Sequence, residues 1–114
     1  MQMVETTRGP VTRVQIARYA GAIGDFNPIH LDEEFAKRAG LPSVIAHGPL
    51  TLALALDAVV AQVGGGSLRR FDARLRAPVV PGETLTVVPT EDGVEIRDRA
   101  GAVVASAVVA LGEA

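Results

Sequence analysis

The sequence predicts a single α+β domain over residues 1–114, in which one long apolar helix packs against an antiparallel sheet of four or five strands. Three observations indicate this fold. The 114 residues suffice for one domain with a modest core and are too few for two ordinary ones. Residues 49–63 are apolar on nearly every side of a helix. After the glycine run at residues 64–66, the spacing of the apolar residues changes from helical to alternating.

Two shorter helices are expected before the long one. The first spans residues 12–24, with Thr12 as its N-cap, Gly24 at its end and apolar side chains at helical spacing, namely Val14, Ile16, Ala17, Tyr19, Ala20 and Ile23. The second follows Asp32 as N-cap and has acidic residues in its first turn, with Lys37 and Arg38 in its last turn and Gly40 just beyond it. The residues between these helices are therefore expected to form a loop.

The long helix should begin near Pro49, whose fixed φ suits a first helical position, and continue to Gly64. Its apolar run falls well short of the roughly 20 residues that span a bilayer, so we expect a buried helix and no membrane insertion. A helix with so little polar surface has to be covered on most sides, by a sheet or by a partner subunit. We interpret Asp57 as lying on a solvated edge of this helix, with a partner subunit or a pocket as alternatives.

The carboxy-terminal half predicts an antiparallel meander. A first strand is indicated by apolar residues that alternate with charged ones, at Phe71, Ala73, Leu75 and Ala77. The stretch PVVPGE then predicts a turn, and Leu85 and Val87 resume the alternation. Asp92 and Gly93 form a hairpin signal before Val94 and Ile96. Residues 102–111 supply a last, more continuously apolar strand.

Composition excludes several classes of protein. The formal net charge is only −2, which indicates no electrostatic hold on nucleic acid. The chain has no cysteine, so disulfides, thiolate zinc sites and cysteine nucleophiles are excluded. The amino terminus MQMVETTRGP lacks the apolar core of a signal peptide. We therefore expect a cytoplasmic protein.

The stretch GDFNPIH, residues 24–30, gathers a carboxylate, an amide and an imidazole around a proline. Pro28 interrupts any helix and biases Asn27 toward extended backbone, so an irregular loop presents Asp25 and His30. A carboxylate and an imidazole that converge can hold a water and exchange protons near neutral pH. The residues alone leave a simpler interpretation open, in which Asp25 caps a turn, Asn27 makes an Asx-turn and His30 is a satisfied loop histidine.

A second motif, IAHGPL at residues 45–50, stands at the start of the long helix. The N–H groups of a first helical turn are unsatisfied and carry the positive end of the helix dipole, so Gly48 N–H is placed to bind a developing oxyanion. The alternative is that Gly48 and Pro49 only start a helix. An acid–base pair and one backbone donor are the parts needed to add water across a double bond conjugated to a thioester carbonyl, or to remove it, without a cofactor.

GDFNPIHLDEEFAKRAG followed by IAHGPLTLALAL closely resembles the MaoC-like, or (R)-specific enoyl-CoA hydratase, family, and FDARLRAPVVPGETLTV resembles its later strand, turn and strand. The resemblance spans residues 12–88. It implies a hot-dog fold, usually dimerised edge to edge, and the interconversion of trans-2-enoyl and (R)-3-hydroxyacyl thioesters of coenzyme A or acyl carrier protein. It also implies that Asp25 and His30 are the catalytic pair, that Gly48 is the oxyanion-hole glycine and that Asn27 is the family's loop amide.

From the residues and the resemblance together, we expect Asp25, His30 and Gly48 to be catalytic, with Asp25 as principal proton acceptor. Asn27, Pro28 and His47 are assigned to substrate binding. His47 has alternative interpretations as a third catalytic group, a metal ligand or a loop-packing residue. We expect no metal, because the two histidines do not stand at a helical ligand spacing and the family uses none.

Two departures and two alternative functions complete the prediction. Pro49 stands where relatives often have methionine, and the short amino-terminal end implies a reduced or missing first strand. The basic residues Arg69, Arg70, Arg74 and Arg76 are interpreted as the wet face of a strand, with coenzyme A phosphates or an acidic carrier protein as the alternative. The alternative functions are a hot-dog thioesterase and the subunit or acyl-binding partner of a heterodimeric dehydratase. A homodimer is the expected assembly.

Overall fold

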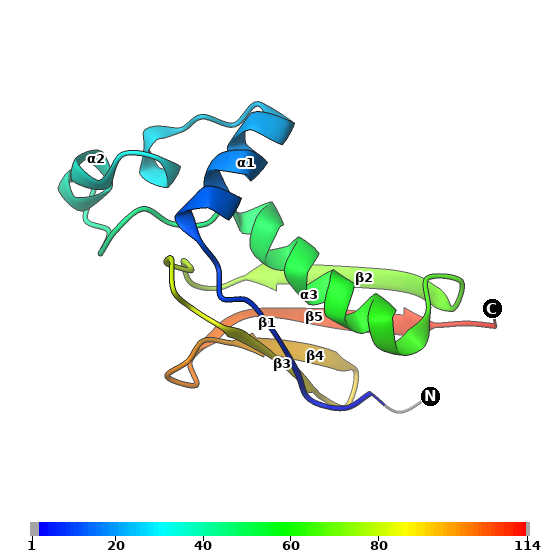
Figure 1. Cartoon of the computed structure of the whole chain (residues 1–114). Helices are drawn as coiled ribbons and strands as arrows, with labels where there is room; N and C mark the ends of the chain where they lie inside the picture. The colour runs from blue at the N-terminus through cyan, green and yellow to red at the C-terminus, as the bar shows by residue number, and fades with distance from the viewer. Residues whose placement is uncertain (1–2, 114) are drawn as a thin grey trace.

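One long helix lies across a five-stranded antiparallel sheet in the structure, a computed structural model that describes residues 3–113 (Figure 1). The order across the sheet is β1-β3-β4-β5-β2, and the strands are β1 (Thr6–Arg8), β2 (Leu68–Leu75), β3 (Leu85–Pro89), β4 (Gly93–Arg97) and β5 (Val103–Leu111). The helices are α1 (Arg13–Ile23), α2 (Glu33–Arg38) and α3 (Gly48–Val63), with a single 3-10 turn η1 (Pro28–His30) between α1 and α2. The expected α+β fold is thus confirmed.

Helix α3 supplies the centre of the core. Its buried residues are Leu50, Thr51, Ala55, Ala58, Val59 and Val63. They pack against inward-facing residues of the sheet, including Leu85, Val94, Ile96 and Ala105. Burying such side chains stabilises the fold by roughly 1.5–3 kcal/mol for each large one, against an extended-chain reference. None of the helices within residues 3–113 combines the length and the apolar character needed to cross a membrane.

Along β4 and β5, the paired residues alternate between the two faces of the sheet. Val94 faces Ala107 across β4 and β5, and Ile96 faces Ala105. These residues are buried under α3, so the residues between them lie on the outer face. At Gly93 the two strands leave no room for a side chain, since a Cβ atom there would overlap the carbonyl oxygen of Ala107.

Helices α1 and α2 and the turn η1 lie beyond the end of the sheet at which α3 begins (Figure 1). Thr12 accepts a hydrogen bond from Gln15 N–H and caps α1, and Asp32 accepts one from Phe35 N–H and caps α2. Helix α1 ends at Gly24, whose φ of 72° is left-handed, so the chain turns there into the GDFNPIH stretch. The predicted caps of both short helices are confirmed.

Several boundaries differ from the prediction. The strand expected around residues 70–77 runs from Leu68 to Leu75, with a register shift between Leu68 and Arg70 that hides its start from a simple alternation. The stretch expected to be an irregular loop contains the turn η1, because Pro28 suits a first helical position even in so short a turn. A single domain was expected over residues 1–114, of which residues 1, 2 and 114 lie outside the described residues. The single domain therefore stays a prediction.

The first strand is reduced to three residues and is present as β1. It pairs with β3, where Thr6 faces Val87 and Arg8 faces Leu85. Arg8 also reaches α3, where its Nε lies 2.9 Å from Oδ2 of Asp57. The Asp57 side chain is 70% exposed, in agreement with the solvated edge expected for it. The ion pair therefore ties β1 to the outer side of α3 at the surface.

Candidate functional site

The GDFNPIH stretch is shaped by its own side chains. Oδ1 of Asp25 accepts a hydrogen bond from Asn27 N–H at 3.2 Å, and Oδ1 of Asn27 accepts one from Ile29 N–H at 3.2 Å. Both are Asx-type bonds, as the simpler interpretation of the loop expects. Only Oδ1 of the Asp25 carboxylate takes part in these bonds. The other oxygen, Oδ2, is directed at the ring of His30.

Asp25 and His30 converge at the amino-terminal end of α3. Nε2 of His30 lies 3.9 Å from Oδ2 of Asp25, and the two side chains are 8% and 46% exposed, respectively. Nδ1 of His30 lies 2.7 Å from the carbonyl oxygen of Ile45. A carbonyl oxygen can only accept, so the neutral ring carries its proton on Nδ1 and leaves the lone pair of Nε2 facing the carboxylate. The pair thus presents two acceptors to one point.

His47 lies directly behind His30. Its side chain is 1% exposed, and its ring stacks on that of His30 with centroids 3.7 Å apart and an angle of 21° between the planes. Nε2 of His47 lies 3.1 Å from the main-chain carbonyl oxygen of Asp25. The ring centroid of Tyr19, on α1, lies 5.0 Å from that of His47. His47 therefore touches both members of the Asp25–His30 pair.

Gly48 is the first residue of α3, and its N–H has no acceptor among residues 3–113. Beside it is an apolar groove of about 400 Å³, lined by Ile45, Ala46, Thr51, Leu75, Pro78 and Val79, among others. A Cβ atom at Gly48 would lie 2.4 Å from Cδ1 of Leu75. Glycine therefore lets the Leu75 side chain pack directly against the helix end.

Asp25, His30 and His47 each offer one ligand atom, and the three atoms lie within 4.8 Å of one another. The arrangement is poor for a metal ion, however. The ring nitrogens direct their lone pairs within the ring planes, and two nearly parallel stacked rings cannot both point at one ion. Nε2 of His47 is also engaged with the Asp25 carbonyl. The expectation of no metal is consistent with this geometry and stays a prediction.

Glu33 ties the segment before α3 together. Its carboxylate accepts hydrogen bonds from Arg13 on α1, with Nη2 at 3.0 Å, and from Val44 N–H at 2.9 Å. The Arg13 hydrogen bond and then that of Val44 hold the pKa of the Glu33 carboxyl below its ordinary value of 4.5. Glu33 thus joins α1, α2 and the chain leading into α3 through one half-buried carboxylate.

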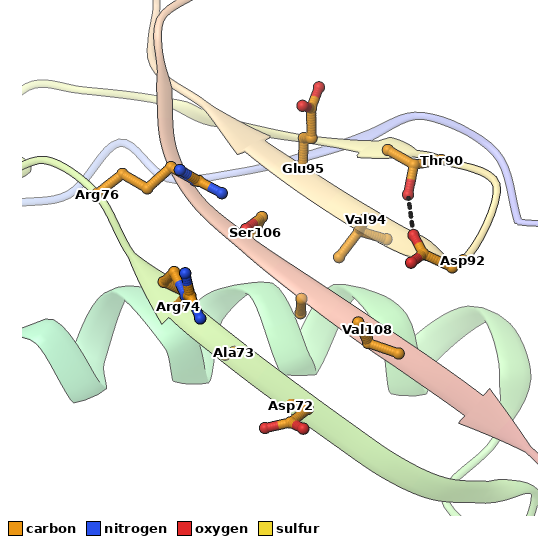
Figure 2. Close-up of a pocket in the computed structure, with 11 residues that line it drawn as sticks. Asp72, Ala73, Arg74, Arg76, Thr90, Asp92, Val94, Glu95, Ser106 and Val108 are labelled. Carbon is orange, nitrogen blue, oxygen red and sulfur yellow. Dashed lines mark hydrogen bonds between the residues drawn. The ribbon is translucent and has the colours of Figure 1, made fainter.

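A second hollow of about 480 Å³ lies on the outer face of the sheet (Figure 2). Its side chains come from three neighbouring strands and the β3–β4 turn, and they include Asp72, Arg74, Arg76, Glu95 and Ser106. Asp72 is paired with Arg70 at 2.6 Å, and Glu95 with Arg97 at 2.6 Å. Of the four arginines interpreted as the wet face of a strand, Arg74 and Arg76 line this exposed hollow (Figure 2).

The predicted site residues therefore divide into two groups. Asp25, His30, His47 and Gly48 come together at the start of α3, whereas Asn27 and Pro28 are exposed and build the backbone of the loop. Two contributors were not predicted, the Ile45 carbonyl that orients His30 and the Leu75 side chain beside Gly48. Ile45 stands inside the IAHGPL motif, so the motif was a usable signal. Leu75 carried no signal except its place at the end of the alternating strand.

Comparisons with known proteins agree with this arrangement. A family model described as MaoC like domain matches residues 2–113. "Enoyl-CoA hydratase 2, peroxisomal" of Arabidopsis thaliana is 40% identical over 76 residues, which are 64% of this chain and 25% of that protein. "3-hydroxyacyl-thioester dehydratase Y" of Mycobacterium tuberculosis is 46% identical over 69 residues, 57% of this chain and 24% of that protein. The chain thus spans about a quarter of the length of these curated relatives.

A solved structure supports the fold over nearly the whole chain. R-Hydratase PhaJ1 from Pseudomonas aeruginosa, in its unliganded form, superposes with a TM-score of 0.79 and 27% sequence identity, covering 96% of this chain and 78% of that one. The long helix α3 packed against an antiparallel sheet is the arrangement that the resemblance implied. The hot-dog fold is therefore confirmed.

Proposed function

This chain belongs to the MaoC-like domain family, and from that premise we propose that it adds water to trans-2-enoyl thioesters to form (R)-3-hydroxyacyl thioesters, or catalyses the reverse dehydration. The observation that carries the proposal is the separation of 3.9 Å between Nε2 of His30 and Oδ2 of Asp25. Two acceptors that each take one hydrogen of the same water molecule stand about 4 Å apart, given ordinary hydrogen-bond lengths. The pair has the spacing needed to hold and polarise the attacking water.

In this proposal, the water oxygen forms a bond to C3 of the substrate while one of its protons passes to the Asp25–His30 pair. Asp25 is the principal proton acceptor. The electrons of the C2–C3 double bond move toward the thioester, so that negative charge develops on its carbonyl oxygen. A proton from the same pair then reaches C2 and completes the addition. Dehydration follows the same steps in reverse order.

Gly48 N–H is the donor proposed for the developing enolate oxygen. It stands at the positive end of the dipole of α3 and has no competing acceptor among the described residues. Donors of this kind contribute about 100- to 1,000-fold to the rate of acyl-transfer enzymes. The groove beside Gly48 is where we place the thioester, since Ile45 in its lining also orients His30. Asn27 and Pro28 stay predicted substrate-binding residues.

We also propose that the chain acts as a homodimer joined through β2. This eight-residue strand is an edge of the sheet, with β5 on one side only. An apolar groove of about 410 Å³ lies between this strand and α3, lined by Pro49, Leu52, Ala53, Leu56, Phe71 and Ala73. A second copy of the chain would pair the open edge and cover the groove. The mass of the purified protein in solution would test this, and a stable monomer would contradict it.

The experiment that tests the proposed function follows the loss of conjugated enoyl-thioester absorbance with crotonyl-CoA and with a longer enoyl-CoA. The expected product is the (R)-3-hydroxyacyl thioester, without free thiol. Release of free thiol would indicate a thioesterase instead. A folded protein that is inert on both substrates, alone and with a carrier-protein thioester, would favour a partner or acyl-binding role. The cytoplasmic location expected from the sequence stays a prediction.

A further inference from the structure

We propose that His47 is a positioning residue that keeps the loop of Asp25, the ring of His30 and the start of α3 in one fixed arrangement. The catalytic consequence of this inference rests on the proposed function, whereas its structural part does not. The ring of His47 is 1% exposed, so it cannot meet a substrate in the groove without a rearrangement of the loop above it. Three of its contacts, with Asp25, with His30 and with the first turn of α3, support this role.

The first contact fixes the loop. Nε2 of His47 lies 3.1 Å from the main-chain oxygen of Asp25, and that oxygen can only accept a hydrogen bond. A neutral His47 ring must therefore carry its proton on Nε2. Nδ1 of the same ring is buried and has no hydrogen-bond partner among the described residues. Leaving a buried nitrogen unpaired is costly, so the ring position needs a reason outside its own hydrogen bonding.

The second contact fixes the imidazole of His30. The two rings stack at 3.7 Å, and the second ring nitrogen of His30, Nδ1, is held at 2.7 Å by the Ile45 carbonyl. Stacking restricts tilting of the His30 ring, while the hydrogen bond restricts its rotation within the plane. Only the orientation that directs Nε2 toward Asp25 satisfies both restraints.

The third contact fixes the helix end. His47 is the N-cap of α3, and its carbonyl oxygen accepts hydrogen bonds from Leu50 N–H at 3.0 Å and Thr51 N–H at 3.2 Å. Gly48, the proposed oxyanion donor, is the next residue along the chain. A displacement of His47 would thus move the donor, the imidazole and the carboxylate loop relative to one another. Misplacement of catalytic groups by about 1 Å costs about 100-fold in rate.

A matched pair of variants separates this role from simple packing. The side-chain amide nitrogen of His47→Gln can reach the place of Nε2 and donate to the Asp25 carbonyl, whereas that of His47→Asn reaches only the place of Nδ1. We expect kcat to fall about fivefold in His47→Gln and about 100-fold in His47→Asn, with KM within about threefold of wild type in both. Equal kcat values in two variants of equal melting temperature would overturn the inference.

A measurement on the unaltered protein covers the case in which a variant does not fold. The ¹⁵N chemical shifts of the imidazoles report which nitrogen of each ring is protonated. The expected result near neutral pH is a proton on Nε2 of His47 and on Nδ1 of His30. A proton on Nδ1 of His47 would remove the bond to Asp25 and refute the inference. No substrate is needed, so a failure of the proposed function would not be mistaken for a failure of this one.

Discussion

Two hollows of this molecule, the outer hollow and the groove beside Gly48, differ in a way that their sizes do not predict. The outer hollow has about 480 Å³ and several charged side chains, and the groove beside Gly48 has about 400 Å³ and is mostly apolar. The outer hollow lies on paired strands whose backbone groups bond to one another. Two of its three acidic residues, Asp72 and Glu95, are each paired with an arginine. The lining contains no histidine, so this hollow has no carboxylate–imidazole pair that could hold and deprotonate a water.

The groove beside Gly48 lies where regular structure stops. A helix start leaves N–H groups without partners, and the loop before η1 leaves one carboxylate oxygen and one ring nitrogen facing each other. These groups have not been matched by folding, so a substrate or a water can bind to them. The comparison teaches that two converging acceptors and a free helix-end N–H locate a candidate reactive site better than volume or charge does.

The largest expected effect comes from the same substitution made at the start of α3 and in the outer hollow. Asp25→Asn keeps the oxygen that bonds Asn27 N–H and loses the basic carboxylate, so we expect kcat/KM for enoyl-thioester hydration to fall about 1,000-fold. Asp72→Asn in the outer hollow should change it less than about twofold. Circular dichroism and a melting curve on both variants serve as folding controls. Similar losses in both would remove the distinction between the hollows.

A smaller effect is expected from filling the space beside the helix end. The new Cβ of Gly48→Ala would come too close to Cδ1 of Leu75, so either the leucine side chain or the helix end must shift. We expect about a 100-fold fall in kcat/KM. Shortening the leucine in the double variant Gly48→Ala/Leu75→Ala should restore most of it, measured against Leu75→Ala alone. The absence of any rescue would show that the loss does not arise from this contact.

The smallest effect concerns the frame of the site rather than its chemistry. The folded-state pKa of Glu33 is lowered by Arg13 and Val44, so its contribution to stability is present above the ordinary value of 4.5 and is lost as pH falls through the folded-state pKa. The free energy of unfolding of Glu33→Gln should lie slightly below that of wild type at neutral pH, and the two should converge in acid. Urea unfolding at several pH values measures this.

Glu34→Gln is the matched control for that comparison. The Glu34 side chain is on the same helix, is 88% exposed and lies 3.8 Å from Arg38. An exposed pair of this kind contributes little to stability. If the difference in unfolding free energy between wild type and Glu33→Gln were independent of pH, the charge of this carboxylate would not be what links α1 to the segment before α3.

Much of the fold could be predicted because the side chains report their own surroundings. The alternation at Phe71, Ala73 and Leu75 predicts a half-buried strand, and the apolar run after Gly48 predicts a central helix. Strand β1 could not be found this way, since Thr6 and Thr7 carry no apolar pattern and the strand forms through its pairing with β3. Pairing with a distant partner is a property of the tertiary structure and leaves no local trace.

The site was predicted in part for a related reason. Asp25 and His30 stand within one motif, and their convergence follows from the loop around Pro28. The stacking of His47 on His30 joins residues from two separate motifs, and no periodicity relates them. Its burial could not be predicted either, because a histidine at a helix start is as compatible with solvent as with the core. The acid–base residues could be predicted from their residue types, whereas the contacts of His47 that hold them in place could be found only in the packed structure.

The close approach of β4 and β5 at Gly93, a residue outside the candidate site, limits which substitutions the protein can tolerate. Any side chain at this position would place a carbon atom against the carbonyl oxygen of Ala107, and the two paired backbones leave no flexible group to yield. Every missense change of a glycine codon introduces a residue with a Cβ atom. A mutational scan should therefore find Gly93 intolerant of every replacement, as though it were an active-site residue, although the harm would come through loss of folded protein.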